Sequence, residues 1–462
     1  MIDRRSFLRY SISGLGAAAG FGTSLASFNA FADNAADYKA LVCIFHFGGL
    51  DCHDSVLPYD IPSYGSFQKV REPLLAAYDS ASPRRREQLL RLGQIDDGRE
   101  FAFPPEYAEL AQLYDSGNLA VVGNVGPMIE PLTRSRYMNR SARRPKKLFS
   151  HNSQQSTWMT SQPDGAIAGW GGRMSDAINT AQKNSNADFT SVSLDKMYPW
   201  SIGLSSTPFV MNRDGPRSPR PRNLTDLSQP EFRTQYFAAI RAAGLDSSNL
   251  FDRDLVDGIN RSLDNNEVME SYLSLPGDPE TEFPAGKLGA ELKMIARAIA
   301  RRNQLGLKRQ IFFVAATGYD HHSRQSIGLP ARQAEVSKAL GAFNASLVEL
   351  GVQDKVTTFT ASEFGRTLVT NGDGTDHGWG GHYFVMGGAV NGGKIYGDIP
   401  PPELGHDFDA GRGRLIPTLS VDQYAATLGR WFGLSESDLD DVMPGLENFD
   451  RAALTGLFNY AS

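Results

Sequence analysis

Apolar residues along the chain form continuous runs of two kinds, and the first kind shows no helical period. Such runs occur at 39–47 (KALVCIFHF), 118–125 (NLAVVGNV), 309–318 (RQIFFVAATG), 355–361 (KVTTFTA) and 383–390 (YFVMGGAV). A short continuous apolar run is typical of a strand that is buried on both faces. The pattern therefore predicts buried strands at these positions.

The second kind of run repeats at helical spacing, over 286–306, 331–351 and 420–433. In the middle stretch, Val336, Leu340, Phe343 and Leu347 fall on one helical face. Ser420 is a plausible N-cap for the last helix. Strands that alternate with amphipathic helices predict an α/β fold, with a mostly parallel central sheet flanked by helices on both faces.

The polar stretch at about 200–285 differs from this alternation. It contains prolines and is weakly periodic. We expect a surface insertion with a few short helices. No linker or repeat divides the remainder, so 33–462 is predicted to be a single α/β domain.

Residues 1–32 have the layout of an export signal. Arg4 and Arg5 precede a Gly/Ala-rich apolar run, which ends near the A-x-A sequence at 30–32. The paired arginines predict a twin-arginine signal peptide cut after Ala32, and hence a periplasmic, secreted or cell-surface protein that meets the twin-arginine export machinery. An uncleaved anchor is the alternative, but the run is short for a membrane span, so we expect none after cleavage.

The charge balance argues against a nucleic-acid partner. The formal net charge is −6 and becomes −8 without residues 1–32. We expect the basic clusters at 83–87 and 140–147 to be solvent-exposed surface. The cluster at 140–147 could also attract anions toward a nearby site. Cys43 and Cys52 are expected to be free thiols, since a straight strand would hold them too far apart for a disulfide.

Five stretches gather the polar residues, and they hold seven of the eight histidines. Three follow predicted strands (HFGGLDCHD, GYDHHSRQ and SEFGRT), the loop GTDHGWGGH at 374–382 precedes one, and the fifth is LFSHNSQQSTW at 148–158. Ligands of open α/β sheets bind beyond the carboxyl ends of the strands. The predicted metal ligands are Asp51, Asp320, His322, Glu363, Asp376 and His377; the predicted catalytic residues are Ser150, His151 and Arg366, with Asn152 and His382 for substrate.

Carboxylates and imidazoles without cysteine suit one or two divalent ions such as zinc, manganese or magnesium. Two ions could clamp a phosphoryl group and activate water or a hydroxyl, and Arg366 could hold an anionic oxygen pair. Structural roles compete with this interpretation. Asp51 could cap the segment after it, Glu363 and Arg366 could pair with each other, and Trp379 is expected to pack.

Read together, these motifs resemble the exported bacterial proteins of the domain-of-unknown-function 1501 family. The resemblance rests on HFGGLD, LFSHNSQQ, GWGGRM, GYDHH, SEFGRT, NGDGTDHGWGGH and GGAVNGGKIYG, and runs from the leader to MPGLENF near the end. It implies an alkaline-phosphatase-like fold from a superfamily of metallohydrolases that includes sulfatases.

The resemblance also implies residue roles. Asp51 matches a metal ligand after the first strand, Asp320 and His322 match a pair on one metal, and His377 matches a late ligand. Where the superfamily usually has TADH, this chain has TASEFGR. Glu363 is then the only ligand in that stretch, and the resemblance does not decide whether a second ion is bound. Ser150 or Ser153 would be the nucleophile, and no C/S-x-P-x-R stretch supports sulfatase chemistry.

These observations predict an exported metal-dependent hydrolase of phosphate or related ester bonds, acting on a small or polymeric ester. The alternative is a non-catalytic periplasmic or cell-surface binding protein that keeps the fold. If His377 binds metal, His377→Ala should remove metal and activity together, and His382→Ala should do less.

Overall fold

The structure is a computed structural model that describes residues 37–79, 82–94, 98–216, 235–240, 242 and 248–459. The predicted signal peptide at 1–32, with Arg4 and Arg5, lies outside the described residues, as does part of the predicted insertion. In the part of the chain that is described, no helix is both long and apolar enough to cross a membrane.

The centre of the fold is a ten-stranded sheet in the order β14-β5-β13-β10-β1-β9-β6-β7-β8, with β15 paired to β5. Its middle consists of parallel strands: β10 (Val356–Ser362), β1 (Lys39–Phe47), β9 (Arg309–Thr317), β6 (Ser191–Leu194) and β7 (Phe209–Asn212). The predicted mostly parallel sheet is confirmed.

One strand of the sheet core runs the other way. β13 (Gly381–Met386) is antiparallel both to β10 and to β5 (Leu119–Gly126). The short strands β14 (Ile395–Tyr396) and β15 (Leu419–Ser420) pair parallel with β5, and β8 (Gly215–Pro216) pairs antiparallel with β7. The reversal at β13 places the start of this strand beside the carboxyl ends of its parallel neighbours.

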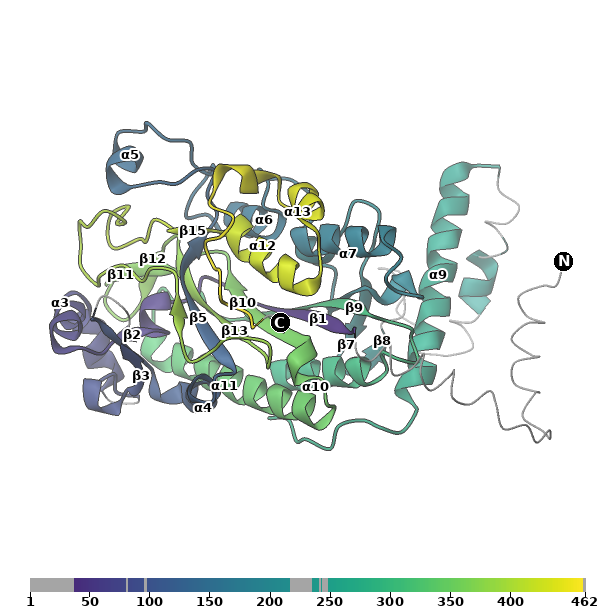
Figure 1. Ribbon diagram of the computed structural model, residues 1–462, viewed down its shortest axis with the longest axis horizontal. Helices are drawn as coiled ribbons and strands as arrows, with labels where there is room; N and C mark the ends of the chain where they lie inside the picture. Colours follow the sequence, from purple (N-terminus) through teal and green to yellow (C-terminus); the bar gives the residue numbers. More distant parts are fainter. Residues whose placement is uncertain are drawn as a thin grey trace.

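Helices cover both faces of the sheet, as Figure 1 shows. One face packs against α4 (Ala108–Asp115), α10 (Lys287–Ala300) and α11 (Gln325–Glu349); the other packs against α6 (His151–Thr160), α7 (Trp170–Thr180), α12 (Val421–Phe432) and α13 (Glu436–Val442). In β1, Val42 and Ile44 join the first apolar core while Cys43 and Phe45 join the second. Burial on both faces explains why the strand has no alternating pattern.

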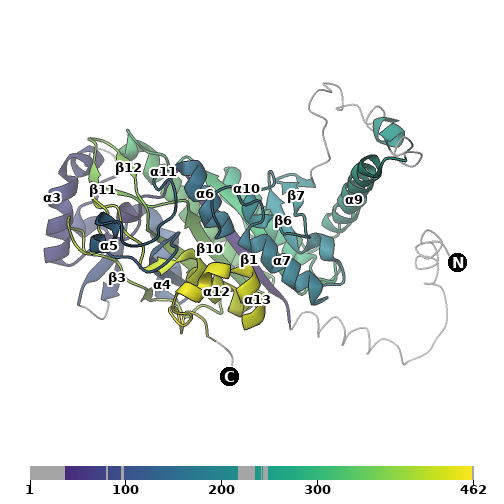
Figure 2. The same ribbon diagram turned by 90° about the horizontal axis from the view of Figure 1, so that it is seen from above.

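Two small sheets flank the central one. They are β2 (Leu57–Pro58), β4 (Glu100–Phe103) and β3 (Leu90–Gln94), and the pair β11 (Arg366–Thr370) with β12 (Thr375–His377). The remaining longer helices are α3 (Ile61–Tyr78), α5 (Arg134–Met138) and α9 (Leu250–Leu273). In both views β11, β12 and α5 lie at the same end of the molecule (Figure 2).

The predicted elements agree with the structure apart from their ends and the insertion. α11 begins at Gln325, six residues before the prediction, and continues through Pro330. Ser420 caps α12 within a capping box, as predicted. In the region predicted to hold a few short helices, the described residues include a helical segment at 235–240 and the 24-residue α9, of which only Val256, Asn266, Met269 and Leu273 are buried. Cys43 and Cys52 are both free and buried, as predicted.

Candidate metal centre

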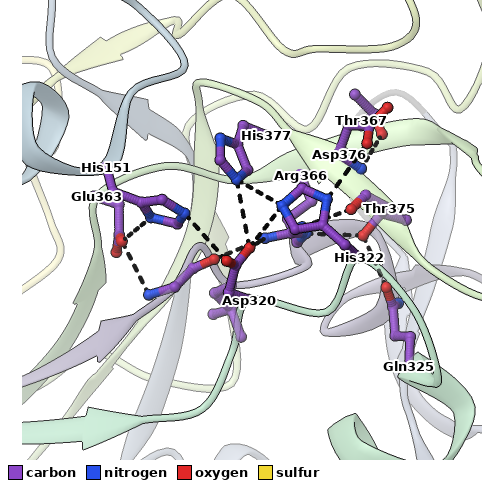
Figure 3. A network of polar contacts seen from close by, with 12 residues as sticks. His151, Asp320, His322, Gln325, Glu363, Arg366, Thr367, Thr375, Asp376 and His377 are labelled. Carbon is purple, nitrogen blue, oxygen red and sulfur yellow. Dashed lines mark hydrogen bonds and ion pairs between the residues drawn. The ribbon is translucent and has the colours of Figure 1, made fainter.

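The site forms where loops from four strands meet at one edge of the sheet. β1 pairs with β9 and β10 so that His46 stands level with Ala316 and Ser362, and these three strands therefore end together. Strand β12, which ends at His377, joins them because the next strand, β13, is antiparallel and starts at this edge. The sequence predicted that the five polar stretches converge, with Asp51, Asp320 and His377 within reach of one or two ions. The register brings Asp320, Glu363 and His377 together, and Figure 3 shows their side chains.

Glycines allow the loops to approach this closely. Gly48 has a φ of +118°, and a Cβ built there would lie 2.4 Å from the backbone nitrogen of Asp320. A Cβ on Gly374 would lie 2.3 Å from the carbonyl carbon of His322. Any side chain at either position would push the loops apart, so these glycines set the spacing of the site.

Three imidazoles surround the carboxylate of Asp320 (Figure 3). Its Oδ1 lies 3.0 Å from Nε2 of His322 and 3.4 Å from Nε2 of His377, and its Oδ2 lies 3.4 Å from Nε2 of His151. The Nε2 atoms of His322 and His377 are 2.8 Å apart. His151, Asp320 and His377 each present a ligand atom within 4.8 Å of the others, an arrangement that could hold an ion.

The other ring nitrogen of each histidine contacts an acceptor behind the cluster. Nδ1 of His151 donates to Oε1 of Glu363 at 2.8 Å, and Nδ1 of His377 donates to the carbonyl of Phe149 at 2.8 Å. Nδ1 of His322 lies 3.5 Å from Asp376. A proton held on Nδ1 leaves the Nε2 lone pair free, which is how metal-binding histidines are usually oriented.

The surroundings shift the pKa values of the three groups in different directions. The hydrogen bond to Glu363, opposed by burial, raises the pKa of His151. Burial lowers the pKa of His377, against the effect of its bond to Phe149. Burial would raise the pKa of Asp320, but the hydrogen bond and charge of Arg366 lower it overall. The centre therefore presents an ionised carboxylate and a neutral His377.

Arg366 lies beneath the cluster and is only 1% exposed. Its Nη1 donates to Asp320 at 2.9 Å and to the Gly48 carbonyl at 2.7 Å, while Nε donates to Thr375 Oγ1 at 2.9 Å. The predicted role in holding a substrate anion is not what the geometry favours, because these donors already bind protein atoms. Arg366 instead pairs with Asp320, and not with Glu363.

Glu363 occupies a different place from the one predicted. Its side chain is fully buried, and Oε1 accepts from His151, from the Gly48 backbone at 2.9 Å and from Gln155 at 2.9 Å. With that oxygen bound by three donors, Glu363 orients His151 rather than facing the cluster as a ligand.

Asp51 also lies apart from the predicted metal position. Both its oxygens bind Arg71, at 2.7 and 2.9 Å, and Gln325 donates to Oδ2 at 2.6 Å. Asp51 and Arg71 are each 1% exposed. Asp51 additionally caps the short 3-10 helix Cys52–Asp54, which was the structural alternative. Its carboxylate therefore balances a buried guanidinium.

The remaining predicted residues divide between the rim and the interior. Asp376 lies beside His322 and pairs with Arg412 at 3.0 Å, so it supports the cluster from outside. Asn152 is exposed on α6. His382 is 1% exposed and its Nδ1 accepts from the Asn124 backbone at 2.9 Å, so a substrate could not reach it. Trp379 is buried and packs, as expected.

The two candidate nucleophiles are distinguishable. Ser153 is buried and its hydroxyl donates to Asp164 at 3.1 Å. Ser150 is the N-cap of α6, is partly exposed, and its side chain makes no capping hydrogen bond. It lies between Phe149, which binds His377, and His151. Of the two, Ser150 has the hydroxyl that is available for reaction.

Sequence reasoning missed the residues that hold the cluster from behind. Gln155 binds Glu363, while Thr375 and Gln325 connect Arg366 to Asp51 through hydrogen bonds of 2.9, 2.8 and 2.6 Å. Gln325 and Gln155 stand within or beside the polar stretches, but nothing in the sequence separates an uncharged amide of this kind from a surface residue.

Several solved structures are similar to this chain, all of them remotely. The PsFucS1 sulfatase from Pseudoalteromonas sp. is 10% identical, with 89% of this chain and 72% of that chain covered and a TM-score of 0.34. The lipoteichoic acid synthase LtaP from Listeria monocytogenes is 8% identical, with 80% of this chain and 69% of that chain covered and a TM-score of 0.31. A mutant of the alkaline phosphatase PafA is 12% identical, over 71% of this chain and 63% of that chain, at a TM-score of 0.26. Scores this low say nothing about the reaction of this protein.

Comparison with curated proteins finds no match. The sequence does match one family, described as "Protein of unknown function (DUF1501)", over residues 38–443. This stretch contains the motifs named above except the leader and MPGLENF, which begins at the last matched residue. With nearly the whole domain matched, the chain belongs to the DUF1501 family.

Proposed function

We propose that this protein is an exported metal-dependent hydrolase of phosphate or related ester bonds. The observation that carries the proposal is the cluster of three imidazoles around Asp320, with a buried acceptor or a carboxylate behind each ring. The Nε2 atoms of all three rings lie near the Asp320 carboxylate, and those of His322 and His377 are 2.8 Å apart, an arrangement that a bound cation would stabilise.

The donor set fits one divalent ion. Three imidazole nitrogens and one carboxylate oxygen match the ligands of zinc and related ions, which bind nitrogen at about 2.0–2.1 Å. Ligands at that distance stand about 3.3 Å apart in a tetrahedron. The Nε2 atoms of His377 and His151 each lie 3.4 Å from an oxygen of Asp320, Oδ1 and Oδ2 respectively, while Nε2 of His322 lies closer, 2.8 Å from that of His377. The side chains of Asp320 and His322 are 45% exposed, so solvent and substrate can reach the centre.

Carboxylates for a second ion are already engaged. Glu363 binds His151, and Asp51 binds Arg71. The guanidinium of Arg366 lies against Asp320 and provides positive charge on the buried side of the cluster. We therefore favour one ion, held by His151, Asp320 and His377, with His322 beside it.

The chain's own residues suit ester hydrolysis at such a centre. A bound divalent ion would supply Lewis-acid chemistry, which polarises the ester and makes an attacking hydroxyl more acidic. Ser150 offers a hydroxyl at the N-terminus of α6, where the helix dipole stabilises developing negative charge. Glu363 and the Phe149 carbonyl fix the proton positions of His151 and His377. Arg366 keeps Asp320 ionised.

The test combines metal content with hydrolysis. We expect the purified full-length mature protein to bind about one equivalent of zinc or manganese and to hydrolyse a generic aryl phosphate. His377→Ala should lose the ion and the activity together. The matched control is His406→Ala, since His406 lies in a loop away from the cluster and its Nδ1 accepts from the Phe408 backbone. Full metal occupancy in folded His377→Ala would refute the centre, while tight metal binding without hydrolysis would favour the non-catalytic binding protein.

Export through the twin-arginine pathway belongs to the same proposal and rests on Arg4, Arg5 and the A-x-A sequence at 30–32. This route carries folded proteins, which suits a chain that takes up its ion before export. Mass spectrometry of protein from the native host should find Asp33 at the N-terminus. Recovery of the full-length chain in the cytoplasm, unchanged by Arg4→Lys with Arg5→Lys, would contradict export.

A further inference from the structure

A strongly basic segment leads into the candidate metal centre. Residues 134–147, RSRYMNRSARRPKK, contain seven Lys and Arg and no Asp or Glu, although the whole chain has a net charge of −6. This basic segment includes α5 and ends three residues before Ser150. Figure 1 shows α5 standing out from the body of the protein at the end that carries β11 and β12.

Neighbouring carboxylates neutralise only part of this charge. Arg136 and Arg143 share the single carboxylate of Glu130, at 2.6 and 2.9 Å. Within the described residues, no carboxylate lies within ion-pair distance of Arg140, Arg144 or Lys146. Arg140 and Lys146 are exposed. The basic segment therefore keeps a positive surplus at the surface.

The segment is held against the His377 loop by an apolar cluster. Tyr137, Leu148 and Phe149 pack with Trp379, and the rings of Tyr137 and Trp379 are 5.9 Å apart. Trp379 follows His377 by two positions. The cations consequently sit on a support that shares its packing with the metal centre, so their distance from it is set by the fold.

A hollow lies within this segment. It has a volume of about 380 Å³ and is lined by Tyr137, Arg144, Pro145, Lys146, Lys147 and Leu148. Arg144 lies 4.9 Å from the Tyr137 ring, which holds its guanidinium in the wall. Lys147 pairs with Asp164 at 3.3 Å, so Arg144 and Lys146 are the cations of the wall that could meet an oxyanion group.

Further cations stand beside the centre at Arg412 and Arg414. Arg412 pairs with Asp376 at 3.0 Å, and Nε of Arg414 donates to the His377 carbonyl at 2.8 Å. Arg414 also lies over the Phe149 ring, 4.7 Å from its centre. Arg412 is balanced by Asp376, whereas Arg414 places positive charge next to both Phe149 and the His377 backbone.

We propose that the substrate is a linear polymer that carries phosphate or sulfate groups at several positions, and that the basic segment binds the part of the polymer next to the reacting ester. This inference rests on the proposed function for the reaction, but binding by the segment is a separate property. Several cations in a row bind a polyanion far more tightly than a monomer, because each added contact releases a counterion.

The test measures binding rather than turnover. Fluorescent dextran sulfate and dextran phosphate, which share one backbone, are titrated against the metal-loaded protein at several salt concentrations. The variant is Arg140→Gln with Arg144→Gln and Lys146→Gln. The control, Lys183→Gln with Lys293→Gln and Lys338→Gln, removes the same charge from exposed positions outside the segment. We expect the variant to bind at least tenfold more weakly. The slope of its log affinity against log salt concentration should become less steep by about 2, since each lost contact contributes roughly 0.7–0.9 to that slope.

The outcomes separate the two proposals. Preferential loss in the variant supports the inference, and the tighter of the two dextrans identifies the anionic group. Equal loss in variant and control, no binding by the unmodified protein, or tighter binding of a DNA duplex than of either dextran would overturn it. If the unmodified protein binds the dextrans but hydrolyses no aryl phosphate, the proposed reaction fails while the binding surface stands.

Discussion

Asp51→Asn is the change that best separates the structural account of this site from the one suggested by sequence. From the sequence, Asp51 is a metal ligand. In the structure its carboxylate binds Arg71 through two hydrogen bonds, and both side chains are 1% exposed. Asparagine keeps the shape of the side chain but leaves the Arg71 guanidinium buried without a counter-charge.

The magnitude follows from that burial. Removing one partner of a buried ion pair costs about 3–5 kcal/mol. Arg71 keeps its bonds to the Thr367 and Leu368 carbonyls, at 2.9 and 3.1 Å, but these do not balance its charge. With an unfolding entropy of roughly 2 cal/mol/K per residue, a chain of 462 residues has about 1 kcal/mol/K. The melting temperature should therefore fall by about 3–5 °C.

The assay pairs urea unfolding and thermal melting with metal analysis of the folded protein. Asp51→Asn should be destabilised but keep its ion, whereas Asp320→Asn should lose the ion. Asp79→Asn is the matched control, because Asp79 pairs with Arg85 at 3.0 Å on the surface, where the two side chains are 48% and 64% exposed. That change should cost less than about 1 kcal/mol.

A second variant tests the cause of the destabilisation. Arg71→Met in the Asp51→Asn background removes the unbalanced charge and should recover part of the lost stability. If Asp51→Asn lost its metal while unfolding at the same urea concentration as the unmodified protein, Asp51 would be a ligand and the reasoning would be refuted.

Three further predictions concern other parts of the molecule. Glu363→Gln should weaken zinc binding by about 10–100-fold in metal titrations, because Glu363 orients His151 without being a ligand; an unchanged affinity would contradict this role. Ser150→Ala should abolish aryl phosphate hydrolysis while leaving metal content intact, and full activity would remove Ser150 from the reaction. Burial raises the pKa of Asp422 to about 6, against its bond from Ser161 at 2.6 Å. The folded state thus holds a proton that the unfolded state releases, so this contribution to stability is present below about pH 4 and is lost as the pH rises through 6. Asp422→Asn should gain stability relative to the unmodified protein over that window, by up to about 3 kcal/mol, and unfolding curves whose difference does not change with pH would refute it.

The sequence by itself determined the main elements of the fold. Strands buried on both faces, such as β1, are apolar at nearly every position, and this pattern is visible without coordinates. The same holds for the apolar face of α11, where Val336, Leu340, Phe343 and Leu347 are all buried as predicted. The sequence also predicted that Asp320 and His322 lie at the candidate site, since ligands bind beyond the carboxyl ends of parallel strands.

Only the tertiary structure decided which carboxylates face the cluster. Asp51 and Glu363 follow parallel strands just as Asp320 does, so their positions in sequence are equivalent. They differ because Arg71 from α3 reaches Asp51, while His151 from α6 reaches Glu363. Which cation or donor meets a buried carboxylate depends on packing between distant segments, and no local pattern records it.

The antiparallel direction of β13 is a second feature that only the tertiary structure shows. His377 precedes its strand, and a parallel β13 would have carried it to the opposite edge of the sheet. Because β13 runs antiparallel to β10, its first residues lie beside the last residues of β1, β9 and β10. Strand direction follows from pairing across the sheet rather than from the residues of the strand, so only the assembled fold brings His377 to Asp320.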